Sequence, residues 1–440
     1  MTASRVALEL VRWLAGTWLL WRIRTCGVDT DDPPNRHLDL AGRAAMDEGE
    51  GLVVVVIPAR DEEERLPRLL ESLAVQDPRP AQVIVVDDAS RDATAEVARS
   101  AGATVVAAGP LPAGWTGKSW ACATGAEVAG AVAASRGDSP AGAVAASRGD
   151  DRAGAVAASR GENPGGAGTE TASTAAPPHH EARPALSAVH ATLVFLDADT
   201  TLAAGGLSRL LGEHRRRGGL VSVQPFHVME RPYEALSAFF NLVSMMGVGA
   251  FTPRRNARPA GAFGPCLVSS TADYAATGGH AHPDVRGRVV EDVALAQRFA
   301  GAGLPVSVLG GRGTISFRMY PRGLSQLVEG WTKNFATGAS STRPFTFVLI
   351  SLWLSGCISA AWYMPAPAPL VVYLAYTGQL AWMLRRIGRF GWWPVLLYPV
   401  PLAFFLVVFA RSLVLTHLRG EVRWRGRTIS TRSPRPPRCP

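Results

Sequence analysis

Residues 193–199 read Leu-Val-Phe-Leu-Asp-Ala-Asp, an apolar run that is followed at once by two carboxylates. A short run of large apolar residues is typical of a strand that is buried on both faces. The carboxylates of Asp197 and Asp199 are poor packing groups, but their oxygens are the hard ligands that Mg²⁺ and Mn²⁺ prefer. A solvated turn is the alternative, because Asp is also common in turns. The rest of the chain decides between these two interpretations.

The same succession of strand, turn and helix recurs from residue 52 onward. Leu52–Ile57 and Val83–Val86 are wholly apolar and predict buried strands, the second followed by Asp87 and Asp88. Strands that alternate with helices indicate an α/β fold with a Rossmann-like, mostly parallel sheet. Ligands of such sheets bind beyond the carboxyl ends of the strands, where both acidic pairs lie. Further helices are expected near 66–73, 92–100, 205–217, 232–247, 288–300 and 323–339, and further strands at 104–107, 220–224, 263–269 and 305–309.

Residues 129–187 interrupt this alternation. The octapeptide Gly-Ala-Val-Ala-Ala-Ser-Arg-Gly begins at Gly130, Gly142 and Gly154, and large apolar residues are nearly absent around it. Such a composition buries too little surface to offset the entropy of ordering the chain. We therefore predict a disordered insertion within a domain that spans residues 50–340; a short solenoid is the alternative.

Three long apolar stretches, at 345–363, 367–384 and 391–416, follow the predicted domain. Each is close to the length that spans a bilayer, so a transmembrane region is expected over 345–416, with a wholly buried helical core as the alternative. Residues 1–25 predict a membrane or interfacial helix that Glu9 and Arg12 interrupt. We expect a multi-pass protein of the plasma membrane with a cytoplasmic catalytic domain.

The basic residues bear on the membrane topology. Residues 411–440 hold eight Arg against one Glu, and the tail 417–440 is expected to meet anionic lipid headgroups. The linker 385–389 is basic too, so three crossings would place linker and tail on opposite faces, against the positive-inside rule. No nucleic-acid reader motif accompanies this charge, and nucleic acid is not an expected partner. Five scattered cysteines argue against a disulfide framework and a zinc site.

Only two of the 45 basic residues are lysines, Lys118 and Lys333, and both lie in motif-like segments. A compact ammonium differs from a guanidinium in geometry and hydration, which suggests specific roles; chance is the alternative. A third acidic pair, Glu291-Asp292, opens a helical pattern, where charge at a helix N-terminus is a sufficient explanation for one pair alone. Three pairs in one α/β unit favour a functional site.

Four segments carry a family resemblance: Val-Ile-Pro-Ala-Arg-Asp-Glu-Glu (56–63), Val-Val-Asp-Asp-Ala-Ser (85–90), Phe-Leu-Asp-Ala-Asp (195–199) and Val-Glu-Asp-Val (290–293). In order and context they resemble a family 2 glycosyltransferase with the GT-A fold. Three more segments, 114–121, 318–321 and 329–335, are similar to membrane enzymes that glycosylate carotenoid acids, of the diaponeurosporenoate type, and to hopanoid-associated glycosyltransferases.

The resemblance implies a nucleotide-sugar donor, usually a UDP-sugar, with Mg²⁺ or Mn²⁺ as cofactor, and a lipid-soluble acceptor. It implies that Asp199 ligates the metal and that Asp292 is the general base, with Glu291 as the alternative base. The residues expected to contact the donor are Ala59, Glu62, Asp88 or Asp87, Asp197 and the cation Lys118. Trp331 and Lys333 are expected to close the site over donor and acceptor.

Two other functions stay open at this stage. One is a glycosyltransferase that makes a different product, either a polyprenyl-phosphate sugar or a polysaccharide. The chain lacks the Gln-x-x-Arg-Trp form typical of processive synthases, which favours a single transfer. The other is a non-catalytic membrane protein that only binds, which would predict missing carboxylates.

Overall fold

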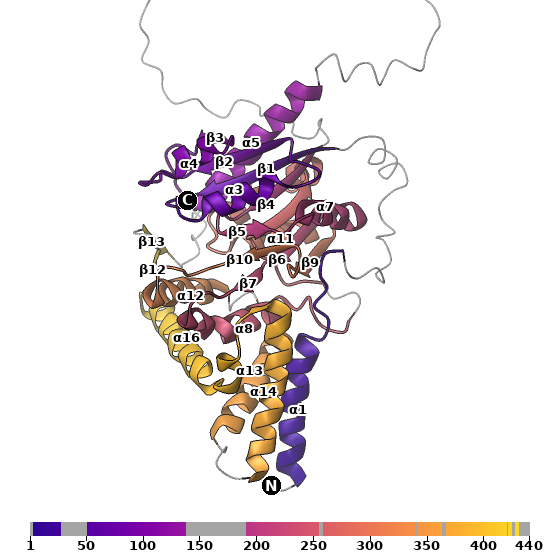
Figure 1. Ribbon diagram of the computed structural model, residues 1–440, viewed down its shortest axis with the longest axis vertical. Coiled ribbons are helices and arrows are strands. Elements are labelled where there is room, and N and C mark those ends of the chain that lie inside the picture. Colours follow the sequence, from indigo (N-terminus) through magenta and orange to yellow (C-terminus); the bar gives the residue numbers. More distant parts are fainter. Residues whose placement is uncertain are drawn as a thin grey trace, which may run out of the picture.

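The computed structural model describes residues 3–27, 51–137, 191–254, 258–338, 342–362, 367–419, 421–424 and 427–430. An α/β domain occupies one end of the molecule, and a bundle of helices projects from it (Figure 1). The N-terminus lies at the far end of this bundle.

A seven-stranded sheet forms the centre of the α/β domain, in the order β3-β2-β1-β4-β8-β6-β9. The strands β1, β2, β3 and β4 are parallel, as are β6 and β9, whereas β8 runs antiparallel to both of its neighbours. The predicted α/β fold with a mostly parallel sheet is therefore confirmed. The strand bounds are β1 Leu52–Ala59, β2 Gln82–Asp87, β3 Thr104–Ala107, β4 Ala191–Leu196, β6 Leu220–Gln224, β8 Cys266–Ser270 and β9 Val306–Gly310.

The apolar runs form central strands because both faces of the sheet are covered. Along β1, Val53, Val55 and Ile57 face one hydrophobic core, and Val54 and Val56 face another. The first core lies under α3 (Leu66–Ala74), α4 (Thr94–Ser100) and α7 (Gly206–Arg217). The second lies under α5 (Gly117–Gly137), α9 (Thr271–Ala276), α10 (Pro283–Arg286) and α11 (Glu291–Gly301), with η3 (Gly279–Ala281) nearby.

The register of the parallel strands brings the acidic pairs to one edge of the sheet. Strand β1 lies between β2 and β4, with Ala59 opposite Asp87 and Val56 opposite Phe195. The residues that follow these three strands therefore emerge side by side.

A small second sheet joins the α/β domain to the helical bundle. Its order is β11-β7-β10-β5, and β11 (Gly388–Arg389) comes from the chain beyond the second long apolar helix. It pairs with β7 (Phe226–Val228), which pairs in turn with β10 (Ile315–Phe317); β5 is Thr200–Leu202.

The bundle has its own core, which is rich in aromatic side chains. Phe240 is stacked on Trp331 with ring centroids 4.9 Å apart, and Phe405 meets both Phe240 and Phe335 edge-on. The elements that supply this core are α1 (Ala3–Leu19), η2 (Pro232–Ser237), α8 (Ala238–Val248), α12 (Leu324–Gly338), α13 (Pro344–Trp362), α14 (Pro367–Ile387), α15 (Trp393–Leu396) and α16 (Pro399–Arg419). Strands β12 (Glu421–Trp424) and β13 (Arg427–Ser430) follow α16.

The three predicted membrane stretches differ from one another in the structure. By length and composition, α13 is the one helix of the described residues that is suited to cross a membrane, and the apolar part of α16, Pro399–Leu415, is shorter. The stretch 391–416 is not one helix, because the chain turns between α15 and α16. Multi-pass topology thus stays a prediction.

The predicted insertion begins later than expected. Helix α5 continues through Gly137, so residues 129–137, including the first repeat, are helical rather than disordered. The repeat can extend the helix because Ala is the strongest helix former. The rest of the insertion lies outside the described residues. All four cysteines that the structure describes are buried and free, as the scattered spacing predicted.

Two helix glycines provide a matched test of the packing of α5 against the sheet. A Cβ at Gly125 would lie 2.3 Å from Cγ1 of Val56 on β1, whereas a Cβ at Gly212 would meet nothing within 4 Å. We expect Gly125→Ala to lower the free energy of unfolding by about 1–3 kcal/mol through overpacking. The same change at Gly212 should be neutral or raise it by up to about 1 kcal/mol. Melting temperatures of the two variants compare them directly, and equal stability would contradict the observed packing.

Candidate active site

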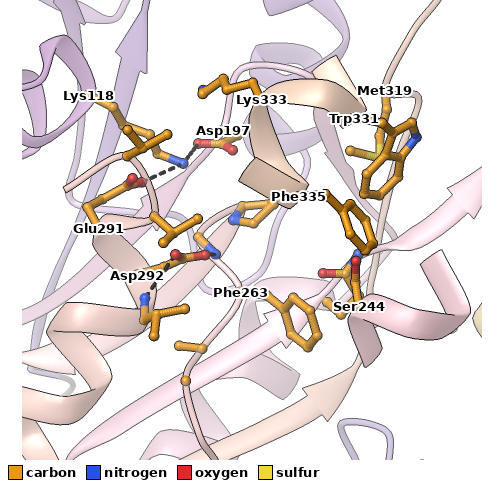
Figure 2. Close-up of a pocket in the computed structure, with 18 of the residues that line it drawn as sticks. Lys118, Asp197, Ser244, Phe263, Glu291, Asp292, Met319, Trp331, Lys333 and Phe335 are labelled. Carbon is orange, nitrogen blue, oxygen red and sulfur yellow. Dashed lines mark hydrogen bonds and ion pairs between the residues drawn. The ribbon is translucent and has the colours of Figure 1, made fainter. Parts of the chain in front are cut away.

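A cavity of about 830 Å³ joins the acidic edge of the sheet to the helical bundle. Charged side chains line one end of it, among them Asp88, Lys118, Asp197, Asp199, Glu291 and Asp292. Apolar side chains from α12, α13 and α16 line the other, among them Phe335, Phe347, Ile350, Leu354, Phe405 and Phe409. Figure 2 shows Lys118, Asp197 and Glu291 on one side of this cavity, across from Met319 and Trp331.

Lys118 connects two of the three acidic pairs. Its Nζ lies 2.7 Å from Oδ1 of Asp197 and 3.3 Å from Oε1 of Glu291 (Figure 2). Burial lowers the pKa of Lys118, but Asp197 and Glu291 outweigh it and raise this pKa well above its usual value. Lys118, which was predicted to contact the donor, is thus positively charged. Its ion pairs connect the residue after β4 to the start of α11.

Asp292 stands at the start of α11, where backbone N–H groups orient its carboxylate. Oδ2 accepts a hydrogen bond from the N–H of Gly264 at 2.7 Å, and Oδ1 accepts one from the N–H of Val293 at 2.9 Å. Burial, and then the charge of Glu291, raise the pKa of Asp292 to about 7, although Lys118 and the two N–H groups oppose the rise. A carboxylate with such a pKa can accept a proton near neutral pH.

Glu291 and Asp292 are adjacent but differ in their surroundings. Glu291 is buried and paired with Lys118, whereas Asp292 is partly exposed to the cavity and makes no ion pair among the described contacts. A carboxylate held by an ammonium is a weak base. The geometry therefore favours Asp292 over Glu291 as a proton acceptor.

The two carboxylates at the end of β2, Asp87 and Asp88, also differ in their surroundings. Asp88 lines the cavity, with Oδ2 3.4 Å from Nη1 of Arg60. Asp87 turns back into its own loop, where Oδ1 accepts a hydrogen bond from the N–H of Ser90. Of the two, Asp88 is the one placed to meet a ligand. Ala59, at the end of β1, also lines the cavity.

Asp199 and Glu62 face one arginine. Nε of Arg65 lies 2.9 Å from Oε2 of Glu62, and its Nη1 lies 3.8 Å from Oδ2 of Asp199. Burial, and then the charge of Asp197, raise the pKa of Asp199 to about 7, since the distant Arg65 compensates only part of this cost. Asp199 is thus a cavity-facing carboxylate with incomplete charge compensation.

This arrangement fits a divalent cation. The described residues contain no cluster of three His, Cys, Asp or Glu side chains that could hold a metal by themselves. Mg²⁺ and Mn²⁺ are often bound by one or two carboxylates together with substrate phosphates. A second positive charge beside Asp199 would also relieve the repulsion between Asp199 and Asp197.

Trp331 and Lys333, the predicted closure residues, both line the cavity from α12. Trp331 is buried between Phe240 and Tyr320, so in this structure it is a packing residue of the cavity wall. The structure thus brings ten of the eleven predicted site residues to one cavity, and Asp87 is the exception.

Some residues of the site were not predicted from the sequence. Arg60 and Arg65 compensate the carboxylates at the charged end; Arg60 lies inside the motif 56–63, and Arg65 is three residues from Glu62, a spacing that could have indicated the pair. The apolar end had no such signal, because its residues come from three helices far apart in the sequence.

A parallel-rich α/β sheet with acidic residues at its carboxyl edge is the architecture expected of a glycosyltransferase with the GT-A fold. The chain matches the family model Glycosyl transferase family 2 over residues 54–131. It is 34% identical over 392 residues to the 4,4'-diaponeurosporenoate glycosyltransferase of Staphylococcus aureus strain MRSA252, covering 86% of this chain and 88% of that protein. The protein of the same name from strain USA300 is 33% identical over the same shares. The chain belongs to glycosyl transferase family 2 and is an enzyme of that family.

Solved structures resemble the chain only distantly. A mannosyltransferase from Pyrobaculum calidifontis, in complex with GDP-Man and Mn²⁺, covers 93% of this chain and is itself covered to 96%, at 16% identity and a TM-score of 0.43.

Removal of the Lys118 ammonium should show how strongly its positive charge stabilises the carboxylates of Asp197 and Glu291. Lys118→Met leaves Asp197 and Glu291 without their cation, and we expect a loss of about 1–3 kcal/mol in the free energy of unfolding at pH 8. The loss should shrink toward pH 5, because Lys118 also lowers the pKa of Asp199 and of Asp292, and its charge no longer stabilises these two groups once they are protonated below about pH 7. Arg99→Met, which removes a positive charge from the exposed face of α4, is the control. A loss for Lys118→Met that is independent of pH, or no larger than the control's, would contradict this role.

Proposed function

We propose that the protein is a membrane-anchored, inverting glycosyltransferase that moves a sugar from a nucleotide-sugar, most simply a UDP-sugar, to a lipid-soluble acceptor. A carotenoid acid or another terpenoid is the acceptor we favour. The relatives named above are glycosyltransferases of 4,4'-diaponeurosporenoate, and this supports the acceptor class. We further propose that the catalytic domain is cytoplasmic and that the membrane is the plasma membrane.

The lining of this cavity carries the proposal. Its charged end suits a nucleoside diphosphate with its metal, and its apolar end suits a hydrocarbon chain. Asp292 lies at the charged end, where it accepts a hydrogen bond from Gly264, and Figure 2 shows Phe263 beside it on the side toward Phe335. A sugar bound at one end and a lipid bound at the other would meet at this carboxylate.

The apolar end also opens outward. Phe347 on α13 and Leu406 on α16 line it, although their side chains are 51% and 37% exposed. Several other exposed positions on these two helices are apolar as well, among them Val348, Val407 and Val414. A lipid acceptor could therefore enter sideways from a bilayer without passing through water.

The chemistry assigns separate roles to the carboxylates. The acceptor oxygen would attack the anomeric carbon as its proton passes to Asp292, and the bond to the diphosphate would break with its electron pair on the leaving phosphate oxygen. A carboxylic-acid acceptor that is buried beside Glu291 and Asp292 would itself be kept protonated, so a base is needed for acids and alcohols alike.

The donor would lie along the charged end. Asp88, Ala59 and Glu62 are proposed to meet the nucleoside, and Asp197 the ribose or sugar. Asp199 would hold the Mg²⁺ or Mn²⁺ ion, which supplies positive charge to the diphosphate. Lys118 is proposed to keep Asp197 and Glu291 in place and to add positive charge near the leaving group. Trp331 and Lys333 are proposed to close the site over both substrates.

The base is tested by Asp292→Asn, with Glu291→Gln as the matched variant. We expect Asp292→Asn to lower kcat about 10²–10⁴-fold and to retain donor binding, because the amide cannot accept the proton. Glu291→Gln should retain more activity. In the parent, kcat/KM should fall as the pH drops below about 7, since protonated Asp292 is inactive. Initial rates and donor affinity measure both effects, and an Asp292→Asn variant with parental turnover would refute the assignment.

The acceptor end is tested at its outer mouth. Ser351 lines the cavity from an exposed position on α13, so Ser351→Trp should obstruct the mouth without disturbing the core. We expect KM for a long-chain lipid acceptor to rise about tenfold or more, with donor binding unchanged. Ile358→Trp, at an exposed position of α13 that does not line the cavity, is the control. Equal KM values for the two variants would show that the acceptor does not use this end.

A further inference from the structure

Helices α1 and α14 run side by side in the same direction. The indole N–H of Trp13 donates to the carbonyl of Ala375 at 3.1 Å, Nε2 of Gln379 donates to Oγ1 of Thr17 at 2.7 Å, and Nη1 of Arg386 donates to the carbonyl of Leu20 at 2.9 Å. Residues later in α1 thus contact residues later in α14, which shows that the two helices are parallel. Leu20 and Arg386 therefore mark the end of the bundle next to the α/β domain.

Helix α13 runs antiparallel to both. The rings of Phe345, near its start, and Trp18 lie 6.0 Å apart. Further along, Gly16 packs against the ring of Trp353, and Arg12 packs against Gly356. The start of α1, the end of α13 at Trp362 and the start of α14 at Pro367 thus lie together at the far end, where Figure 1 places the N-terminus.

Arg5 is exposed near the start of α1, but the two charges in the middle of this helix do not interrupt its outer face. Arg12 and Glu9 pair at 2.8 Å, and their side chains are 21% and 13% exposed. The outer face presents apolar residues about half exposed: Val6, Leu10, Val11 and Leu14. Thr377 and Gln379 on α14 are likewise buried inside the bundle. The polar groups in the middle of α1 and α14 therefore face other helices, whereas the exposed Arg5 and Arg385 lie near helix ends.

The bundle is long enough to span a bilayer. At about 1.5 Å per residue, helices of 17, 19 and 21 residues measure roughly 25–32 Å, against a hydrocarbon thickness of roughly 30 Å.

Helix α16 does not run the full length of the bundle as α1, α13 and α14 do, because it begins partway along it. The hydroxyl of Tyr398, just before α16, donates to the carbonyl of Cys357 at 3.2 Å, and its ring stacks on Tyr373 at 4.7 Å. Cys357 lies at the level of Arg12, about midway along α1. From there α16 returns toward the α/β domain, where Oγ of Ser412 donates to the carbonyl of Thr332 on α12 at 2.8 Å.

The segment before α16 completes a re-entrant path. The chain leaves the domain at β11, descends through α15 to Tyr398 midway along the bundle, and returns through α16. Strand β12 then lies beside α12, on the domain side, and β13 pairs with it (Figure 1).

The distribution of arginines agrees with this path. At the domain end lie Arg22, Arg24, Arg385, Arg386 and Arg389, whereas the far end, over residues 3–8, 358–362 and 367–372, carries Arg5 as its one charged residue. Basic residues favour the cytoplasmic side of a membrane, next to anionic lipids.

We propose that α1, α13 and α14 cross the bilayer and that α15 and α16 form a re-entrant hairpin that returns the tail to the side of the catalytic domain. The apolar surface of the bundle is then the lipid-facing surface. This arrangement removes the conflict between the basic linker and the basic tail, because both lie on one side. The inference rests on the membrane association in the proposed function and does not depend on the glycosyl transfer.

Cysteine labelling tests this topology in the full-length protein. Reporters are Trp362→Cys at the far end and Trp392→Cys at the domain end, whose native side chains are 80% and 71% exposed. Both are made with Cys439→Ser; the native Cys439 reports on the tail. A membrane-impermeant maleimide should label Trp362→Cys in spheroplasts, and it should label Trp392→Cys and native Cys439 in inside-out vesicles.

Each other outcome overturns the proposal. Labelling of Trp392→Cys and Cys439 from opposite sides would mean that α16 crosses, and labelling of Trp362→Cys and Trp392→Cys from one side would mean that the bundle does not cross. In either case the proposed reaction stands. Release of the chain by alkaline carbonate would refute the topology and the membrane anchor together, and a transfer assay on the released protein would still test the enzyme.

Discussion

The ion pairs of Lys118 with Asp197 and Glu291 are the constraint on which the rest of the site depends. They join the start of α5, the end of β4 and the start of α11, three segments that the chain brings together only through the sheet. With Glu291 held by the ammonium, Asp292 is left as the carboxylate that faces the cavity. The same ammonium keeps Asp197 beside Asp199, so one cation organises both the base and the proposed metal ligand.

The aromatic core of the bundle extends this organisation toward the lipid phase. Phe240, Trp331, Phe335 and Phe405 pack α8, α12 and α16 together, and several of these side chains also line the cavity. The pairing of β11 with β7 fixes the bundle to the α/β domain. A hydrophobic acceptor would thus be presented to Asp292 by the same helices that we propose to hold the enzyme at the bilayer.

The sequence predicted the sheet well, because apolar runs that end in carboxylates leave few alternatives to buried parallel strands. Leu220–Gln224 and Thr104–Ala107 were expected at the observed bounds. Local patterns could not separate Asp87 from Asp88 or Glu291 from Asp292, since adjacent residues differ only in the direction that the fold gives to each side chain. They also made Glu9 and Arg12 appear to interrupt α1, because partners on α13 and α14 are invisible in sequence. The apolar end of the cavity depends on helix packing and left no motif.

The central claim is that one cavity receives a nucleotide-sugar at its charged end and a lipid at its apolar end. It is tested most directly by incubating membranes that contain the protein with a panel of labelled nucleotide-sugars and a lipid extract. The account predicts one labelled, solvent-extractable product whose mass is that of a terpenoid acid or alcohol plus one sugar, formed by the parent and not by Asp292→Asn. Label in a polymer or in a polyprenyl phosphate, or equal labelling by the variant, would contradict it.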